Sequence, residues 1–243
     1  MIAPDSGSSG IGLRSSPDGV TWTAVHPSRP QNARARALAG TEPELAVGYD
    51  LCRGNGELVM LFEIAYPMLS ASSDGSHWTA WSVIDAKNLR SPNLAFFASQ
   101  TYIACTDGDG NVMVLTSPDP RSGHWDSIDL GGKYTSKQRV ILSVVGPLLV
   151  LGFVDTGGML KLLSSHDGQE WCPESVAPPI AVPQDFAMCG FRGRGDEVEK
   201  LYVVFLDGAG LVRVRMWPGE RSTRSRNDVG HLAMVTVGTC QRF

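Results

Sequence analysis

Short runs of apolar residues, in places alternating with polar ones, recur along the whole chain and are separated by turn-forming residues. Runs such as 58–62, 102–105 and 148–153 have the length of strands rather than of helices. No stretch shows an amphipathic helical period of useful length. The pattern therefore predicts an all-β protein.

A Ser-rich turn followed by tryptophan occurs four times and divides the chain into periods. The four copies lie within residues 15–23, 72–79, 117–125 and 164–171. The spacings between their tryptophans are 56, 47 and 46 residues, for Trp22, Trp78, Trp125 and Trp171. A nearly constant period of this size indicates stacked or radially arranged units.

The Asp-Gly pair within three of these copies predicts a tight β-hairpin, because Asp tolerates positive φ and Gly adopts it freely. Ser and Asp side chains can also bind the turn amides, and tryptophan supplies a large apolar side chain for packing. We therefore interpret the repeated motif as a folding element.

The copies resemble the Asp-box of sialidase-like propellers, with the consensus Ser-x-Asp-x-Gly-x-Thr-Trp. Three copies are one residue shorter between Asp and Trp, the third is longer, and the counterpart near residues 216–219 lacks both the Asp and the aligned Trp. The resemblance covers the hairpins only, and it implies the fold rather than the activity. The chain also lacks the Arg-Ile-Pro motif of true sialidases and is short for their six blades. Because the Asp-box of sialidases is remote from their active site, the resemblance implies no catalytic residue here.

Each period contains four predicted strands, which form one four-stranded antiparallel blade. Turns at 107–110, 155–158 and 207–210 mark the connection between second and third strands, and residues 4–7 match the same turn. The N-terminus therefore begins late in a second strand, and residues 231–235 are predicted as a first strand, so that the two termini jointly complete one blade. Such closure removes exposed sheet edges. We predict a single five-bladed β-propeller domain over residues 1–243.

Composition and charge narrow the range of partners. The chain is 42% hydrophobic with a formal charge of −4 and a pI near 5.7, which disfavours a nucleic-acid partner. No apolar run approaches the length of a bilayer span, and the N-terminus does not resemble a signal peptide. The five cysteines show no CxxC spacing, which argues against a zinc site. We expect a cytoplasmic monomer with no membrane partner.

One position is polar in every predicted blade, immediately before the innermost strand. The residues at this position are Glu44, Asn93, Gln138, Asp185 and His231. Innermost strands line the central channel of a propeller, so these side chains should ring its mouth. They could simply hold ordered water, or they could form a concave site with two carboxylates and an imidazole. We favour one asymmetric site, because the residue differs in each blade while the turn is repeated.

The predicted catalytic residues of this ring are Glu44, Asp185 and His231. His231 is the natural proton-transfer group near neutral pH, and the two carboxylates lie in non-adjacent blades across the channel. Asn93 and Gln138 could donate hydrogen bonds to a polar substrate. Nearby loop residues that could hold an anionic or hydroxyl-rich group are Arg34, Arg36, Arg90, Lys133 and Tyr134, with solvated loop positions as the favoured alternative for each.

The run 107–111 has the alternating oxygens of a calcium loop, but it lacks the distal Glu, and a hairpin turn is favoured. We expect neither a metal nor a cofactor.

These observations predict an enzyme-like propeller that acts on one small polar or metabolite-sized substrate by acid/base chemistry, a hydrolysis or a cyclisation. A non-catalytic carbohydrate-binding propeller is the first alternative, and a protein-interaction scaffold is the second. The expected partner is a small-molecule or glycan ligand.

Overall fold

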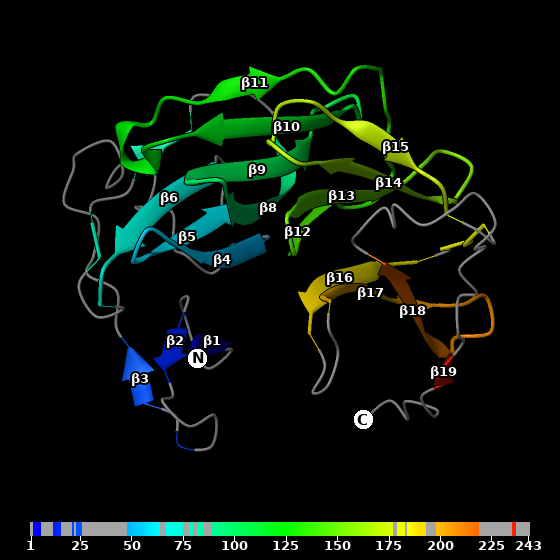
Figure 1. Ribbon diagram of the computed structural model, residues 1–243. Helices are drawn as coiled ribbons and strands as arrows, with labels where there is room; N and C mark the ends of the chain where they lie inside the picture. The colour runs from blue at the N-terminus through cyan, green and yellow to red at the C-terminus, as the bar shows by residue number, and fades with distance from the viewer. Residues whose placement is uncertain are drawn as a thin grey trace. The chain divides into compact units, whose positions relative to one another are not determined.

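The computed structural model consists of β-strands joined by turns (Figure 1). It describes residues 2–5, 12–15, 21, 23–25, 48–63, 67–74, 78–79, 82–84, 89–176, 179–182, 184–192, 198–218 and 235–236. Over these residues the only helix is a short 3₁₀ turn, η2 (Pro120–Ser122). Over the same described residues, no helix is long and apolar enough to cross a membrane. The all-β prediction is confirmed.

The strands form antiparallel sheets in which each strand pairs with its neighbour in sequence. The first sheet has three strands, β1 (Ile2–Asp5), β2 (Gly12–Ser15) and β3 (Thr23–Val25). The second contains β4 (Gly48–Gly54), β5 (Glu57–Glu63), β6 (Pro67–Ser72) and β7 (Ser82–Val83). The third contains β8 (Arg90–Phe97), β9 (Gln100–Thr106), β10 (Val112–Ser117) and β11 (Asp126–Ile128).

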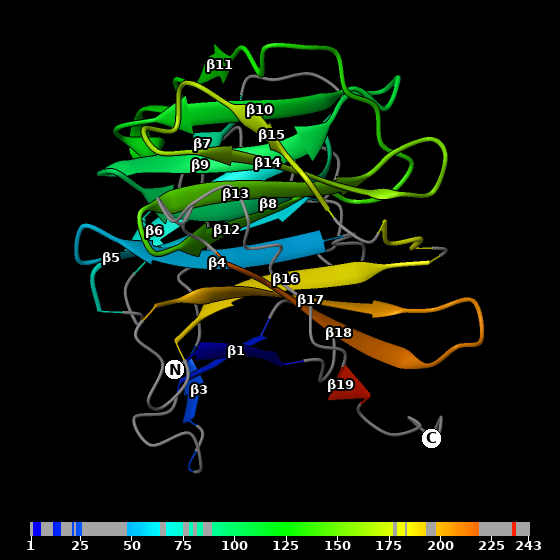
Figure 2. The same ribbon diagram turned by 45° about the vertical axis from the view of Figure 1, so that its right-hand side comes forward.

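Two further sheets follow the same order. One contains β12 (Ile141–Val145), β13 (Leu148–Val154), β14 (Leu160–Ser165) and β15 (Cys172–Glu174). The other contains β16 (Phe186–Phe191), β17 (Lys200–Leu206), β18 (Val212–Pro218) and β19 (Val235–Thr236). Figure 2 shows the meander of β16, β17 and β18 from a second side. The predicted strands at 58–62, 102–105 and 148–153 lie within β5, β9 and β13.

Burial explains where the apolar alternation persists and where it is lost. All seven residues of β13 are buried, because this strand is covered on both faces. In β17, Leu201, Val203 and Phe205 are buried while the residues between them are half-buried. The sheet of β16–β19 is therefore well covered on one face only.

The predicted turns between second and third strands are confirmed at three places. In the second of them, one carboxylate oxygen of Asp155 accepts hydrogen bonds from the backbone N–H groups of Gly157 and Met159, both at 2.9 Å. Gly158 in this turn has φ +80°, which glycine adopts without strain. Asp107 and Asp207 make the same pair of bonds in their turns. The oxygens of Asp107 thus serve a hairpin turn.

The C-terminal strand differs from the prediction. Residues 231–235 were expected to be the innermost strand of a blade completed with the N-terminus. Instead, β19 pairs with β18 as the fourth strand of that sheet, opposite Arg213 and Val214. The edge of β18 offers free backbone groups, and a short β-branched segment satisfies them. Residues 219–234 lie outside the described part of the chain.

The chain forms two compact units, residues 1–103 with 115–127, and residues 104–114 with 128–243. Within the first unit, β8 contacts β4 and β5; within the second, β12 contacts β16 and β17. First strands of consecutive sheets thus lie together inside each unit. The single domain over residues 1–243 stays a prediction.

Glycine permits the closest approach between β12 and β16. A Cβ atom at Gly190 of β16 would overlap the carbonyl oxygen of Val144 in β12. The Gly190 N–H instead donates a 2.8 Å hydrogen bond to the hydroxyl of Ser143, which is buried. In the first unit, a Cβ at Gly54 of β4 would overlap the ring of Phe96 in β8. Both contacts require the absence of a side chain.

We predict that Gly190→Ala lowers the free energy of unfolding by about 1–3 kcal/mol, because the added methyl group forces β12 and β16 apart. Gly208→Ala is the matched control, since a Cβ there meets no atom within 4 Å. Urea unfolding of both variants measures the difference. Equal stability of the two variants would contradict this account of the packing.

Candidate functional site

The polar residues predicted to ring a channel make hydrogen bonds between consecutive sheets where the structure describes them. In the first unit, Asn93 Nδ2 donates to Oδ2 of Asp50 at 2.6 Å, and the Leu94 N–H donates to the same oxygen at 2.6 Å. The other oxygen of Asp50 accepts from the Leu51 N–H at 2.8 Å. Asp50, which the sequence analysis did not single out, thereby ties β4 to β8.

A similar tie occurs in the second unit. Gln138 Nε2 donates to the carbonyl oxygen of Val182 at 3.0 Å. Nε of Arg139 donates to Asp185 at 2.9 Å, and Nη2 of Arg139 donates to the carbonyl oxygen of Phe186 at 2.7 Å. The structure therefore brings the segment before β12 next to the segment before β16. Arg139, beside the predicted position, was missed.

Of the remaining predicted site residues, some are described by the structure and others are not. The ring of Tyr134 contacts that of Phe153, with centroids 5.5 Å apart, and Arg90 is exposed at the start of β8. Glu44, His231, Arg34 and Arg36 lie outside the described residues. The ring as a catalytic site stays a prediction.

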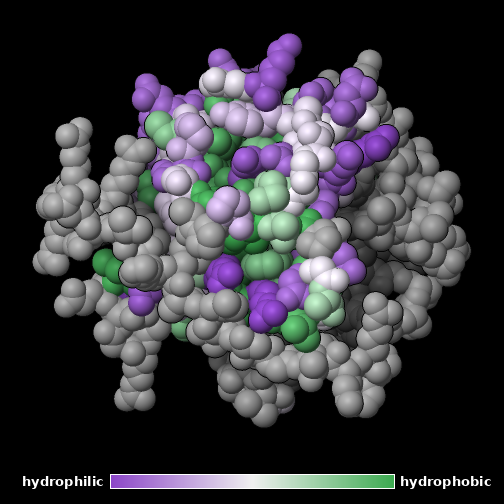
Figure 3. Space-filling model, turned by 90° about the vertical axis from the view of Figure 1, so that its right-hand side faces the viewer, coloured by the Kyte–Doolittle hydropathy of each residue, from purple (hydrophilic) through white to green (hydrophobic). Residues whose placement is uncertain are grey.

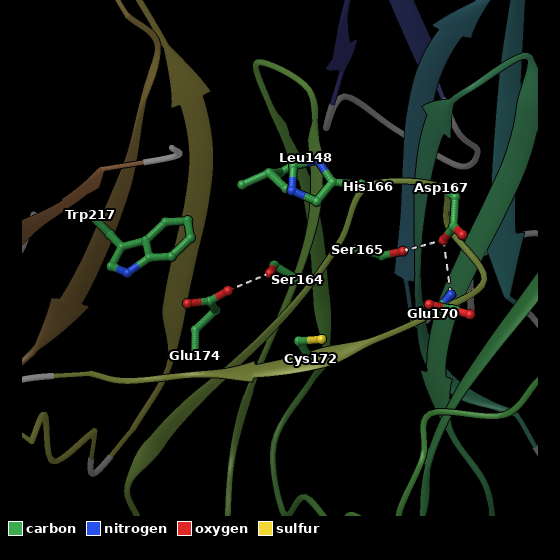
Figure 4. A pocket seen from close by; sticks show the side chains of 9 residues that line it. All are labelled: Leu148, Ser164, Ser165, His166, Asp167, Glu170, Cys172, Glu174 and Trp217. Carbon is green, nitrogen blue, oxygen red and sulfur yellow. Dashed lines mark hydrogen bonds between the residues drawn. The ribbon is translucent and has the colours of Figure 1, made fainter. Parts of the chain in front are cut away.

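A pocket of about 170 Å³ lies in the second unit, between the outer strands of one sheet and β18 of the next (Figure 4). It is lined by Leu148, Ser164, Ser165, His166, Asp167, Glu170, Cys172, Glu174 and Trp217. Leu148, Ser164 and Ser165 are buried, whereas Glu174 and Trp217 are half-buried. The pocket is thus a small, open depression with a buried apolar and hydroxyl floor.

The Asp-Gly turn after β14 forms one wall of this pocket. Oδ1 of Asp167 accepts hydrogen bonds from the Ser165 hydroxyl at 3.0 Å and from the backbone N–H groups of Gln169 and Glu170 at 2.8 and 2.9 Å. The N–H of Gly168 donates to the Ser165 hydroxyl at 2.8 Å. These amides, Glu170 first, hold the pKa of Asp167 below its usual value of 3.8. Asp167 is therefore ionised and fixed in place.

Glu174 and Trp217 form the opposite wall. The Ser164 hydroxyl donates a 2.5 Å hydrogen bond to Oε1 of Glu174, which orients the carboxylate. In Figure 4 this carboxylate points to the side of the pocket where the indole of Trp217 lies. The pocket thus combines an aromatic ring with a fixed carboxylate.

Part of the pocket belongs to the motif that was interpreted above as a folding element. The lining residues between 164 and 170 lie in its fourth copy, whereas Trp217 lies near residues 216–219, where the motif is lost. The loss of the motif at that place was the available signal. Among the residues that the structure describes, no three His, Cys, Asp or Glu side chains are arranged to hold a metal ion.

The corresponding cleft in the first unit is closed. Ala71 and Thr79 take the places of Ser164 and Cys172 there, but only about 10 Å³ remains. The longer third copy of the motif forms η2, capped by Asp119, and η2 contacts β6. Arg121 of η2 also forms an ion pair with Glu57 of β5. An insertion thus fills one cleft, whereas the other stays open.

Figure 3 shows one face of the molecule, on which apolar areas are interrupted and bordered by hydrophilic side chains.

No family model matches the sequence, and no curated protein sequence matches it either. Solved structures do match. The SapL1 lectin in complex with alpha methyl fucoside is 12% identical with a TM-score of 0.61, over 96% of this chain and 74% of that chain. A fucose-specific lectin from Aleuria aurantia is 13% identical with a TM-score of 0.54, over 79% of this chain and 62% of that chain.

A mutant of Trypanosoma rangeli sialidase with trans-sialidase activity is 13% identical with a TM-score of 0.56, over 87% of this chain and 42% of that chain. The chain also spans only 41% of Bacteroides ovatus Xyloglucan PUL GH43B. At such identities the similarity shows the fold alone, and these are propeller folds. The predicted propeller-like fold is confirmed at this level.

We predict that Asp167→Ala lowers the free energy of unfolding by about 1 kcal/mol at neutral pH, because an exposed carboxylate that binds amides contributes modestly. The folded-state pKa lies below the unfolded value of 3.8, so this stabilisation is present above that value and is lost as the pH falls through the folded pKa.

Urea unfolding at neutral pH and well below pH 3.8 measures the effect. Asp109→Ala is the control, because it removes the same charge from an exposed turn residue that contributes only its backbone N–H. A difference between wild type and Asp167→Ala that persists unchanged in acid would contradict the assignment.

Proposed function

We propose that the protein is a carbohydrate-binding, lectin-like β-propeller that holds one sugar unit of a glycan between Trp217 and Glu174. In this proposal the five described sheets are five blades, and the repeated Ser-Asp turns are Asp-boxes that build the blades. The observation that carries it is the open pocket, which joins an indole to a carboxylate held by Ser164.

The chemistry of these walls suits a sugar. An indole offers a flat apolar surface to the C–H face of a pyranose, and ionised carboxylates accept strong hydrogen bonds from hydroxyl groups. At about 170 Å³ the pocket is smaller than the sites of drug-sized ligands, about 300–1,000 Å³. It therefore fits a monosaccharide unit with the rest of the glycan in solvent.

The structural neighbours support the fold of this proposal. SapL1 is described in complex with alpha methyl fucoside, and the Aleuria aurantia protein is described as fucose-specific. Because one fold hosts many functions, the ligand class rests on the pocket rather than on these similarities.

Acid/base catalysis at the predicted ring is the alternative function, and it stays a prediction. It depends on Glu44, Asp185 and His231, of which the structure describes only Asp185, bound to Arg139. Glu44→Gln, Asp185→Asn and His231→Ala would test it in an assay for glycoside turnover. Loss of turnover in all three with glycan binding retained would support an enzyme.

We predict that Trp217→Ala and Glu174→Gln each weaken glycan binding by tenfold or more. In Glu174→Gln the sugar loses a hydrogen bond to a charged group, which costs about 1.5–3 kcal/mol, and about 1.4 kcal/mol corresponds to a factor of ten. In Trp217→Ala the sugar loses the flat apolar surface of the indole. A glycan array identifies the oligosaccharide bound by the wild type, and calorimetry measures its Kd for each variant.

The matched controls are Phe191→Ala and Asp126→Asn. Phe191 is an exposed aromatic residue, 57% accessible, and Asp126 is an exposed acid; neither lines the pocket. Both controls should bind like the wild type. The proposal fails if no glycan binds, or if the pocket variants bind as tightly as the controls.

A further inference from the structure

Acidic side chains outnumber basic ones among the described residues that line the pocket. In this described lining Asp167, Glu170 and Glu174 contribute three carboxylates, and none of the residues is Lys or Arg. At neutral pH the pocket therefore favours a cationic ligand and repels an anionic one.

The carboxylates are placed on two sides of the pocket. Asp167 and Glu170 belong to the turn after β14, whereas Glu174 lies in β15 and points towards Trp217 (Figure 4). Glu170 is exposed and Glu174 is half-buried, so solvent screens the former more than the latter. The Glu174 carboxylate beside the indole is the stronger position for a positive charge.

An indole and a carboxylate that face the same space recognise a cation in two ways. The carboxylate accepts charge-assisted hydrogen bonds from an ammonium group, and the ring attracts the same charge through its quadrupole. A neutral sugar would keep the stacking on the indole and the hydroxyl contacts but would lack the charge-assisted bond to the carboxylate. A uronic or sialic acid would place its own carboxylate against three others.

We propose that the pocket selects an amino sugar, a hexosamine unit with a free amino group, whose ammonium group lies at Glu174 and whose ring lies on Trp217. This inference rests on the proposed carbohydrate-binding function and adds the class of sugar. Sugars with a carboxylate or sulfate group are excluded by the charge of the pocket.

The test compares trisaccharides of similar size and different charge on the full chain. The probes are chitosan trimer with free amines, its N-acetylated counterpart tri-N-acetylchitotriose, cellotriose, and trigalacturonic acid. Spermidine is added as a cation that is not a sugar. Calorimetry at mildly acidic pH, where the free amines of the probe are mostly protonated, and at low salt should give a Kd for chitosan trimer at least tenfold lower than for tri-N-acetylchitotriose or cellotriose. Trigalacturonic acid should bind most weakly.

Glu174→Gln should bring the ratio of the cellotriose Kd to the chitosan trimer Kd down towards one. The variant should still bind cellotriose weakly. Glu170→Gln serves as a second variant in case Glu174→Gln does not fold, and it should reduce the same preference by a smaller factor. Asp126→Asn is the control and should keep the full preference. Added salt should weaken the chitosan complex more than the cellotriose complex.

The outcomes separate this inference from the proposed function. Binding of tri-N-acetylchitotriose or trigalacturonic acid as tight as that of chitosan trimer, and sensitive to Trp217→Ala, would overturn the amino-sugar inference and leave a lectin. Failure of every trisaccharide to bind, with another glycan bound on the array, would overturn the amino-sugar inference alone. Failure of every glycan on the array to bind would overturn both. Spermidine binding as tightly as chitosan trimer, with the same dependence on Trp217, would show a cation site without sugar selectivity and would also overturn the inference.

Discussion

Close packing between the first strands of consecutive sheets is the contact on which the rest of this structure depends. In the second unit β16 approaches β12 so closely that only glycine fits at position 190, with its N–H bound to Ser143. In the first unit the carboxylate of Asp50 binds both Asn93 and the Leu94 amide, which joins β4 to β8. These contacts combine steric exclusion with hydrogen bonds between buried or partly buried groups, and both are short-ranged. They fix the spacing of neighbouring sheets at one end.

With the first strands held together, what fills the space between the outer strands decides whether a ligand can bind. In the first unit the insertion that forms η2 occupies this space, and Arg121 secures it through Glu57. In the second unit no such insertion is present among the described residues, and Trp217 of β18 lines an open pocket. The turn of Ser165 and Asp167 is rigid because its oxygens bind successive amides. A folding element thus also presents the wall of a candidate site, as expected when function is carried by loops on a rigid scaffold.

The sequence allowed the strands and turns to be predicted, because alternation and Asp-Gly turns are local properties. Strands such as β5, β9 and β13 lie where the pattern placed them. The predicted partner of the C-terminal strand was wrong, because β19 pairs with β18. Pairing at a sheet edge depends on tertiary contacts, which a local sequence pattern does not report. The polar residues before the first strands were recognised, but their partners Asp50 and Arg139 were not. The pocket was missed because it needs Glu174 and Trp217, 43 residues apart, and no local pattern joins them.

The central claim is that a sugar lies between Trp217 and Glu174, in the space left open between two closely packed sheets. A crystal structure of the protein with a glucosamine-containing oligosaccharide tests it most directly. The account predicts a pyranose ring stacked on the Trp217 indole with its amino group next to the Glu174 carboxylate. A sugar bound beside Gln138 and Asp185, with the Trp217 pocket empty, would contradict it.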